Sequence, residues 1–353
     1  MKRAMIAMSG GVDSSVAAYL SVQAGYDCMG MTMRLYTNEE IGRTEKTCCS
    51  LDDVEDARSV AFRLGIPYRV FNFTEEFRTC VIDRFVNAYE HGETPNPCID
   101  CNKYLKFGKI FQRMDELGYD YVVTGHYARI EQVGDRYLLK KGLDDSKDQS
   151  YVLYGLTQAQ LSRTLFPLGG MAKSDARRIA EEQGFLNAHK HDSQDICFVP
   201  DGDYARFMEH YTGHDYPNGE FVDEQGKVLG EHKGIIRYTI GQRKGLGLAL
   251  PCPMYVKDKD MEHNRVILSK NEDLFSKSLD ARDFNWSAFD CPDGPIRAKA
   301  KIRYKHTEQP ATITPTGPDT VHVEFDEPQR AICRGQAVVL YDGDTVIGGG
   351  TIL

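Results

Sequence analysis

The sequence predicts an α/β fold in which a domain built on a parallel sheet comes first, followed by a small central domain and a C-terminal β-barrel. Residues 1–130 alternate strand-like and helix-like segments, and this alternation is typical of a parallel sheet covered on both faces. From residue 276 onward, apolar and polar side chains alternate with period two between turn residues, which is typical of an antiparallel barrel or sandwich. We therefore expect domains over 1–200, 201–275 and 276–353.

The first domain is predicted to begin with a strand over 4–8 and a helix over 13–25. A strand over 26–36, a helix over 51–65 and a strand over 67–73 follow, and then helices over 77–92 and 103–117 and a strand over 121–128. Gly25 and Gly65 end the first two helices, as glycine commonly does. In the central domain we expect a short helix over 201–211 and strands within 234–248 and 265–269.

Composition excludes several classes of protein. Of the 353 residues, 41% are hydrophobic and 27% are charged, which is ordinary for a globular protein. No apolar run reaches the roughly 20 residues that a membrane span needs, and the N-terminus is too quickly polar for a signal peptide, so we expect a cytoplasmic protein without a membrane partner. The net charge of −9 argues against a generally basic nucleic-acid coat but permits a local basic face.

The segment "AMSGGVDSS" (7–15) stands where the first strand should pass into the first helix. Two glycines let a phosphate approach the backbone, and a helix N-terminus favours an anion. Asp13 could hold Mg²⁺ or orient the loop. The alternative is a glycine-rich turn that binds nothing. The segment matches neither the dinucleotide fingerprint nor the Walker pattern. It resembles the pyrophosphate (PP) loop of the ATP pyrophosphatase superfamily. This resemblance implies that ATP is cleaved between its α and β phosphates and that a carbonyl oxygen is adenylated.

Three of the ten cysteines stand in informative surroundings. Cys98 and Cys101 precede a lysine-rich helix, where a thiolate is favoured. Half of a zinc site, a redox pair or two buried cysteines would explain them as well. Cys197, in "DSQDICFVP", would by itself be a buried structural cysteine. For Cys48 and Cys49 a structural role and a metal site both stay open.

Five ordered motifs resemble the tRNA-specific 2-thiouridylases over essentially the whole chain: "SGGVDSS", "TPNPC..CNK..KFG", "TGHYAR", "KDQSYVL" and "DSQDICFVP". The resemblance implies ATP-dependent 2-thiolation of the wobble uridine in tRNA for Lys, Glu and Gln, with Mg²⁺ and a cysteine desulfurase or sulfur-relay protein as donor. The ATP-binding residues that it implies are Ala7, Met8, Ser9, Gly10, Gly11, Val12, Asp13, Ser14, Met33 and Gly125.

The same resemblance assigns the nucleophile to Cys101 and the persulfide to Cys197. It implies that the two cysteines end each turnover as a disulfide. Some family members carry Asp in place of Cys98, so an acid–base role of that Asp does not carry over. An iron–sulfur cluster held by Cys98 or Cys101 with Cys197 is a less favoured alternative. Apart from the open question of Cys48 and Cys49, no residue is assigned as a metal ligand.

For the tRNA anticodon stem-loop the resemblance implies contacts from Asn96, Pro97, Cys98, His126, Lys147, Asp148, Gln149, Arg303, Tyr304 and Gln336. His126 could equally be a core histidine. The run "RAKAKIRYKH" places five basic residues at alternate positions, 297 to 305, so a strand would show all five on one face to phosphates.

Two other functions remain possible from sequence. Another adenylating enzyme of the superfamily, such as an amide-forming synthetase, would need no cysteine pair. A noncatalytic RNA-binding or redox-sensing protein could keep the loop as a nucleotide site.

Overall fold

The computed structural model describes residues 1–37, 39–41, 51–190, 196–199 and 201–353. Its internal contacts divide the chain into two units. Unit 1 comprises residues 1–82, 97–202 and 343–348, and unit 2 comprises residues 83–96, 203–342 and 349–353. Cys48, Cys49 and residues 191–195 of the "DSQDICFVP" motif lie outside the described residues. The boundaries expected at about 200 and 275 stay a prediction.

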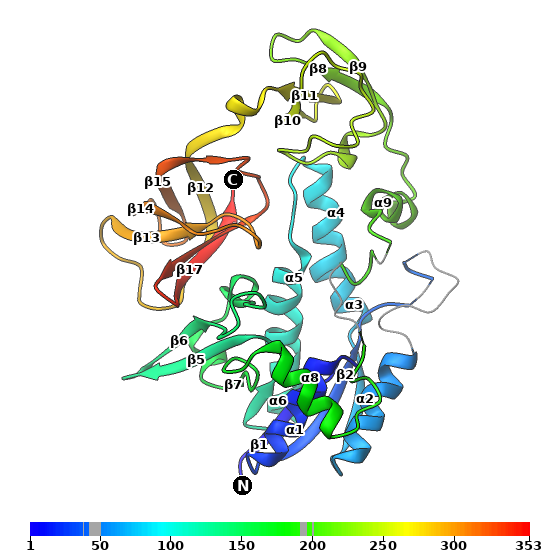
Figure 1. The fold of residues 1–353 in the computed structure, drawn as a ribbon, viewed down its shortest axis with the longest axis vertical. Helices are drawn as coiled ribbons and strands as arrows, with labels where there is room; N and C mark the ends of the chain where they lie inside the picture. The colour runs from blue at the N-terminus through cyan, green and yellow to red at the C-terminus, as the bar shows by residue number, and fades with distance from the viewer. Residues whose placement is uncertain (38, 42–50, 191–195, 200) are drawn as a thin grey trace. The chain divides into compact units, whose positions relative to one another are not determined.

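Unit 1 is built on a five-stranded sheet in which all neighbouring strands pair in parallel, as predicted (Figure 1). The strand order is β3-β2-β1-β4-β7, with bounds β1 (Arg3–Ala7), β2 (Asp27–Arg34), β3 (Tyr68–Asn72), β4 (Tyr121–Val123) and β7 (Thr164–Leu165). The middle of β1 is fully buried, whereas the edge strand β3 is mostly exposed. A central parallel strand is apolar on both faces for this reason.

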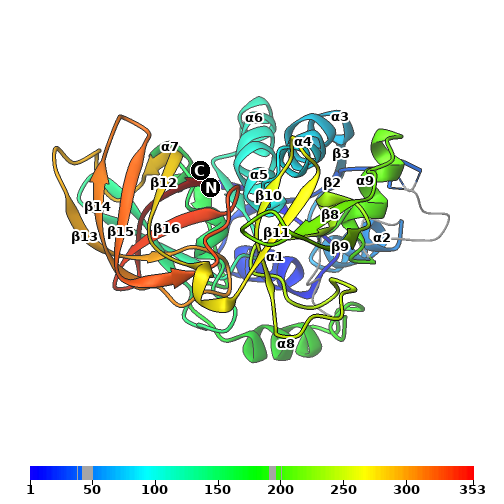
Figure 2. The ribbon, with the colours of Figure 1, turned by 90° about the horizontal axis from the view of Figure 1, so that it is seen from above.

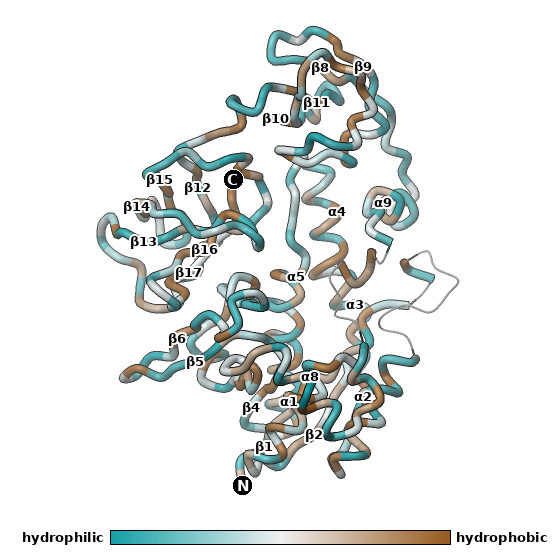
Figure 3. The backbone as a smooth tube through the Cα atoms, in the orientation of Figure 1, coloured by the Kyte–Doolittle hydropathy of each residue, from teal (hydrophilic) through white to brown (hydrophobic). Residues whose placement is uncertain are grey.

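Helices cover both sides of this sheet. In Figure 2, α1 (Val12–Gln23) and α8 (Lys173–Glu182) lie on one side and α6 (Ile110–Glu116) on the other. The remaining helices of unit 1 are α2 (Leu51–Arg63), α3 (Thr74–Phe77), η1 (Arg78–Ile82), α5 (Pro97–Asp100), η2 (Cys101–Lys109), η3 (Ser150–Leu153) and α7 (Gln158–Leu161). Hydrophobic residues of α1, β1 and α8 form one core, and these segments carry brown stretches in Figure 3. No helix in the described ranges is long and apolar enough to span a bilayer.

The segment between residues 128 and 141 forms a hairpin that we did not predict. Its strands are β5 (Ala128–Val133) and β6 (Arg136–Lys141), and β6 pairs with the last strand of the chain at Lys140 and Thr345. The predicted strand over 121–128 is therefore two elements, because β4 ends at Val123 and a loop containing Gly125 separates it from β5.

Unit 2 begins with α4 (Asp83–Glu90) and continues with α9 (Tyr204–Thr212), as predicted for residues 201–211. A four-stranded sheet follows in the order β10-β11-β8-β9, made of β8 (Gly219–Val222), β9 (Val228–His232), β10 (Tyr255–Asp260) and β11 (Arg265–Ser269). The strand expected within 234–248 is wrong. This stretch holds the short helix η4 (Ile235–Arg237) and turns in which Gly241, Gly245 and Gly247 have positive φ, a conformation outside the strand region.

The C-terminal region is a closed antiparallel barrel, as predicted. The barrel order is β12-β15-β14-β13-β16-β17, and pairing of β12 with β17 closes it. Its elements are η5 (Asn271–Leu274), β12 (Phe275–Trp286), β13 (Ile296–Lys301), β14 (Gln309–Pro315), β15 (Val321–Arg330), β16 (Ala337–Asp342) and β17 (Thr345–Ile352). Alternate side chains of β14 and β15 are buried, as the period-two pattern requires.

Candidate active site

The loop between β1 and α1 is held in a shape that only glycine permits. Gly10 has φ +75°, and a Cβ on it would lie 2.4 Å from the backbone oxygen of Asp53. Gly11 occupies the N-cap of α1 and has no side chain to cover the first helical turn. The N–H groups of a first turn have no acceptor within the helix. The loop therefore presents backbone donors at the carboxyl edge of the sheet, which is the environment expected for a phosphate.

Gly125 packs directly against this loop from the neighbouring strand end. A Cβ at Gly125 would lie 2.7 Å from the carbonyl carbon of Asp13 and 2.8 Å from the backbone nitrogen of Ser14. Met33, near the carboxyl end of β2, is half-buried. The sequence-predicted ATP residues thus come from the ends of three adjacent strands, β1, β2 and β4.

The carboxylate of Asp13 is held by two side chains that sequence reasoning missed. Nζ of Lys173 lies 2.7 Å from Oδ1 and 2.8 Å from Oδ2, and the hydroxyl of Tyr127 donates to Oδ1 at 2.8 Å. Lys173 is only 8% exposed. Of the two roles expected for Asp13, the arrangement supports orientation of the loop, while magnesium binding stays a prediction.

The other flank of the loop carries a second lysine that was not predicted. Lys190 forms ion pairs with Asp53 and with Asp56, the latter at 2.9 Å. Hydrogen bonds to both partners raise the pKa of Lys190, although desolvation, the largest single cause, acts against them. Asn187 donates to the Gly10 carbonyl at 2.9 Å. Among the described residues, Oδ1 of Asn187 is buried and has no hydrogen-bond partner, so a polar acceptor remains beside the loop.

Cys98 and Cys101 lie at the start of one continuous helix, α5–η2–α6. Because this helix leads into the parallel strand β4, its first turns lie toward the carboxyl edge of the sheet. Both cysteines are reduced thiols. The expected lowering of the pKa of Cys98 is not found: desolvation by the surrounding atoms raises the pKa, and Lys106 opposes that rise only in part. Within the described residues, no group of three metal-ligating side chains is present.

Cys197 is tied to the end of the second strand. Its carbonyl oxygen accepts a hydrogen bond from the hydroxyl of Tyr36 at 2.7 Å, and Tyr36 follows β2 closely. The next residue, Phe198, is buried edge-on against Phe77 with ring centroids 5.7 Å apart. Cys197 itself is a half-buried reduced thiol, so the backbone is anchored while the thiol keeps some exposure.

His126 lies in the core of unit 1, so the sequence-based alternative of a core histidine is confirmed. It is 7% exposed, and its Nδ1 lies 2.7 Å from the hydroxyl of Thr124. The rings of Phe107 and Phe166 flank it at 6.0 and 5.8 Å. Desolvation, with a smaller contribution from Lys106, lowers the pKa of His126 well below its ordinary value. The ring is therefore neutral, and any contact with tRNA would be made without charge.

The predicted tRNA segment Lys147–Gln149 already makes hydrogen bonds within unit 1. Asp148 accepts from the backbone N–H of Gly142 at 3.0 Å and from the hydroxyl of Ser150 at 2.8 Å. Oε1 of Gln149 accepts from the backbone N–H of Tyr127 at 3.0 Å. These contacts fix the shape of the segment.

The basic strand face predicted for residues 297–305 is only partly present. Strand β13 ends at Lys301, and residues 302–305 form a bend and turn, so Arg303 and Lys305 do not continue its alternation. Arg297 forms a bidentate pair with Asp326 at 2.8 and 2.7 Å. Lys299 is exposed, and Lys301 lies over the ring of Tyr304 at 5.8 Å. The turn after Ile302 breaks the period of two on which the prediction depended.

In unit 2, Gln336 holds the segment that leads to the cysteines. Its Nε2 donates to the carbonyl of Thr94 at 2.7 Å, and the backbone N–H of Thr94 donates to the carbonyl of Arg334 at 2.8 Å. Asn96, two residues further on, is half-buried, and Pro97 opens α5. Arg303 donates to the carbonyl of Arg330 at 3.2 Å. Gln336 therefore anchors the backbone at Thr94, whatever contact it makes with RNA.

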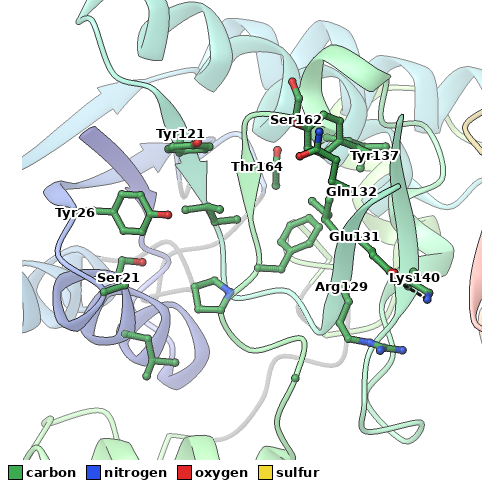
Figure 4. A pocket seen from close by; sticks show the side chains of 18 residues that line it. Ser21, Tyr26, Tyr121, Arg129, Glu131, Gln132, Tyr137, Lys140, Ser162 and Thr164 are labelled. Carbon is green, nitrogen blue, oxygen red and sulfur yellow. Dashed lines mark hydrogen bonds and ion pairs between the residues drawn. The ribbon is translucent and has the colours of Figure 1, made fainter. Parts of the chain in front are cut away.

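A pocket of about 670 Å³ on unit 1 has none of the predicted ATP-binding residues or catalytic cysteines in its lining (Figure 4). Tyr26 and Tyr121 line it with ring centroids 5.7 Å apart, and Lys140 pairs with Glu131 at 2.6 Å on the facing hairpin. Arg129 pairs with Asp344, and the hydroxyls of Ser162 and Thr164 donate to backbone carbonyls, so these polar groups are already engaged. We do not place the reaction there.

Three family models match successive parts of the chain. They are described as the tRNA methyl transferase HUP domain over residues 2–201, the tRNA methyl transferase PRC-barrel domain over 205–270 and the aminomethyltransferase beta-barrel domain over 276–352. Among solved structures, a 4-thiouridine synthetase–RNA complex with bound ATP has 19% identity and a TM-score of 0.35, covering 60% of this chain and 50% of its own.

Relatives match over nearly the full length. The tRNA-specific 2-thiouridylase MnmA of Clostridioides difficile is 52% identical, with 99% of this chain and 98% of the relative covered. The enzyme of that name from Symbiobacterium thermophilum is 52% identical, covering 99% and 92%, and that from Lachnoclostridium phytofermentans is 49% identical, covering 100% of both chains. The chain belongs to the family of tRNA-specific 2-thiouridylases.

Proposed function

We propose that the protein 2-thiolates the wobble uridine of tRNA for Lys, Glu and Gln, converting ATP to AMP and pyrophosphate. The observation that carries the proposal is the common position of the loop and Cys197. The loop follows the carboxyl end of β1, and Tyr36, which holds the Cys197 carbonyl, follows that of the adjacent parallel strand β2. A nucleotide and a sulfur carrier at the same sheet edge are what the reaction needs.

The loop fits the triphosphate of ATP. Gly10 leaves no side chain between the backbone and a phosphate, and the side-chain amide of Asn187 donates to the Gly10 carbonyl and holds the turn in place. Residues Ala7–Ser14 would hold the phosphates, and Met33 and Gly125 would border the adenosine. Mg²⁺ would accompany the phosphates through their own oxygens, as it does in most nucleotide sites.

Adenylation solves the problem of the leaving group. O2 of uracil leaves poorly, but attack of O2 on the α-phosphate releases pyrophosphate and converts O2 into part of AMP. The loop donors stabilise the charge that develops on the phosphate oxygens during this attack. An anticodon base can leave its stack and enter such a site at a low cost in free energy, because the bases of a single-stranded loop have no base pairs to break.

Sulfur transfer then requires two cysteines. A persulfide on Cys197 attacks C2, a C–S bond forms and AMP leaves. The thiolate of Cys101 attacks Sγ of Cys197, which breaks the S–S bond, leaves the sulfur on C2 and forms the Cys101–Cys197 disulfide. The transferred sulfur gains two electrons and the two cysteines lose two. A dithiol reductant restores them, and a cysteine desulfurase or relay protein reloads Cys197.

The test compares cysteine variants by mass spectrometry of tRNA nucleosides. Cys101→Ser and Cys197→Ser should each abolish 2-thiouridine formation, whereas Cys252→Ser, which changes an exposed cysteine of unit 2, should retain it. Thiolation by either of the first two variants would refute the assignment. Loss of activity in Cys197→Ser also excludes an amide-forming synthetase, and tRNA-dependent release of AMP excludes a noncatalytic RNA-binding protein.

The iron–sulfur alternative has its own measurement. Protein purified without oxygen should contain no stoichiometric iron and show no visible charge-transfer band if the persulfide route is used. Iron at cluster stoichiometry, together with thiolation that depends on it, would replace this part of the proposal.

A further inference from the structure

Lys173 and Tyr127 connect segment 144–149 to the ATP loop, although both lie far from the loop in sequence. The backbone N–H of Lys173 donates to Oδ2 of Asp144 at 3.1 Å, while its Nζ lies within 2.8 Å of both oxygens of Asp13. Lys173 is thus fixed at both ends. The Ser146 hydroxyl, and then the Lys173 N–H, hold the pKa of Asp144 below its ordinary value, which keeps this anchor ionised.

Tyr127 makes the second connection. Its N–H donates to Oε1 of Gln149 at 3.0 Å, the N–H of Gln149 donates back to its carbonyl at 2.9 Å, and its hydroxyl donates to Oδ1 of Asp13 at 2.8 Å. A Cβ at Gly142 would lie only 2.8 Å from the Tyr127 carbonyl oxygen. The backbone of Tyr127 is therefore closely packed against Gly142, just before this segment, and Tyr127 is 2% exposed.

We propose that Tyr127 and Lys173 are positioning residues through which tRNA bound at Lys147–Gln149 tightens the binding of ATP at the loop. This inference rests on the proposed function, because it takes the loop as the ATP site and segment 147–149 as a tRNA contact. The two residues both contact Oδ1 of one carboxylate, so an ordered segment holds Asp13, and with it the first turn of α1, in one place.

The coupling between tRNA and ATP passes along two series of contacts, one through Lys173 and one through Tyr127. A phosphate at Lys147 restrains the segment, the restrained segment fixes Asp144 and Gln149, and these fix the two residues that contact Asp13. Coupling of this kind is reciprocal, so ATP must tighten tRNA binding by the same factor. Coupling between sites typically amounts to a change in affinity of about 5–150-fold.

The experiment measures the affinity of the full-length protein for α,β-methylene-ATP, which cannot be cleaved between the α and β phosphates, with and without unmodified tRNA. We expect tRNA to tighten binding in the wild type by at least about five-fold. In Tyr127→Phe and Lys173→Met this ratio should fall to within about two-fold of one, and Lys173→Arg, which keeps the charge, should recover part of it.

Two matched controls separate coupling from general loss of structure. Tyr121→Phe removes a hydroxyl that accepts from Lys2 at 2.6 Å, and Lys140→Met removes an ammonium paired with Glu131. Both should retain the wild-type ratio. Tyr127→Phe keeps the buried ring, so its thermal unfolding temperature should stay close to that of Tyr121→Phe, and it remains a valid test if Lys173→Met does not fold.

The outcomes are distinguishable. If Tyr127→Phe keeps the wild-type ratio, or if the controls lose it equally, the inference is overturned while the proposed function stands. The same holds if tRNA has no effect on a wild type that binds the analogue and thiolates tRNA. If the wild type neither binds the analogue nor thiolates tRNA, the proposed function itself fails.

Discussion

The ammonium of Lys173 lies 2.7 and 2.8 Å from the two carboxylate oxygens of Asp13, in a position that is almost closed to solvent. A buried charge needs a partner to offset its lost hydration. The buried ammonium of Lys173 therefore depends on Asp13, whose side chain is half-buried. This pair joins the first turn of α1 to the first residue of α8, so a neighbouring helix helps to orient the loop between β1 and α1.

The close approach of Gly125 to the loop makes a direct prediction. In Gly125→Ala the added Cβ would overlap the backbone of Asp13 and Ser14, so the strand end or α1 must shift. Overpacking of this kind costs about 1–3 kcal/mol of stability, and we expect ATP affinity to fall at least about ten-fold. Gly170→Ala is the control, because a Cβ there meets nothing within 4 Å. Equal calorimetric affinities for the two variants would contradict the assignment.

The buried neutral ring of His126 predicts a loss of stability in acid. Its pKa is lowered in the folded state, so below the ordinary value of about 6.5 the unfolded chain binds a proton that the folded chain does not. Stability from this group is complete above that pH and falls toward acid by up to about 1.4 kcal/mol per pH unit. Urea unfolding between pH 7 and 5 should show a smaller decline in His126→Gln than in the wild type.

A control keeps this comparison specific. His189 is exposed, with 86% of its side chain accessible, and His189→Gln should keep the wild-type decline. If His126→Gln declines as steeply as His189→Gln, His126 does not remain neutral in the folded protein.

Lys259 in unit 2 is predicted to destabilise the fold. It is 5% exposed, none of the described residues offers a hydrogen bond to its Nζ, and burial lowers its pKa to about 8. Between about pH 8 and its ordinary value of 10.5 the unfolded chain binds more protons, so stability should rise with pH across this window. At pH 7 the buried ammonium costs about 3 kcal/mol.

Lys259→Met should therefore unfold at a higher urea concentration than the wild type at pH 7, with a smaller gain at pH 10. Lys257→Met changes a more exposed lysine of the same strand that pairs with Glu224, and it should leave the midpoint nearly unchanged. A lower midpoint for Lys259→Met than for Lys257→Met would show that the ammonium stabilises the fold.

Two basic residues of the barrel strand β13, Lys299 and Arg297, should contribute differently to the salt dependence of tRNA binding. Lys299 is exposed, whereas Arg297 is engaged by Asp326. If β13 contacts tRNA phosphates, Lys299→Ala should reduce the slope of log affinity against log salt by about one, and Arg297→Ala should reduce it less. Filter binding across a salt series measures both slopes. An affinity for tRNA that ignores ionic strength would contradict phosphate binding.

Sequence predicts correctly those parts of the fold that are determined by residues close together along the chain. The turn from β1 to α1 was predicted because its glycines and serines are adjacent, and the barrel because its alternation is continuous. The strand expected within 234–248 failed because Gly241, Gly245 and Gly247 adopt positive φ, and composition does not distinguish a turn-rich segment from a strand rich in glycine.

The parts of the site that sequence missed depend on contacts between distant residues. Lys173 and Tyr127 lie 160 and 114 positions from Asp13. Tyr127 belongs to the motif "TGHYAR", next to His126, but no local pattern indicates that its hydroxyl reaches Asp13. Nothing local distinguishes Lys173 from the other lysines, because only tertiary packing brings it to the loop.

The most direct test of the cysteine chemistry is a single turnover of protein loaded with persulfide at Cys197, given ATP and unmodified tRNA without reductant. Mass spectrometry of peptides and nucleosides should find one Cys101–Cys197 disulfide and one AMP for each 2-thiouridine formed. Formation of 2-thiouridine while both thiols stay reduced would contradict the mechanism.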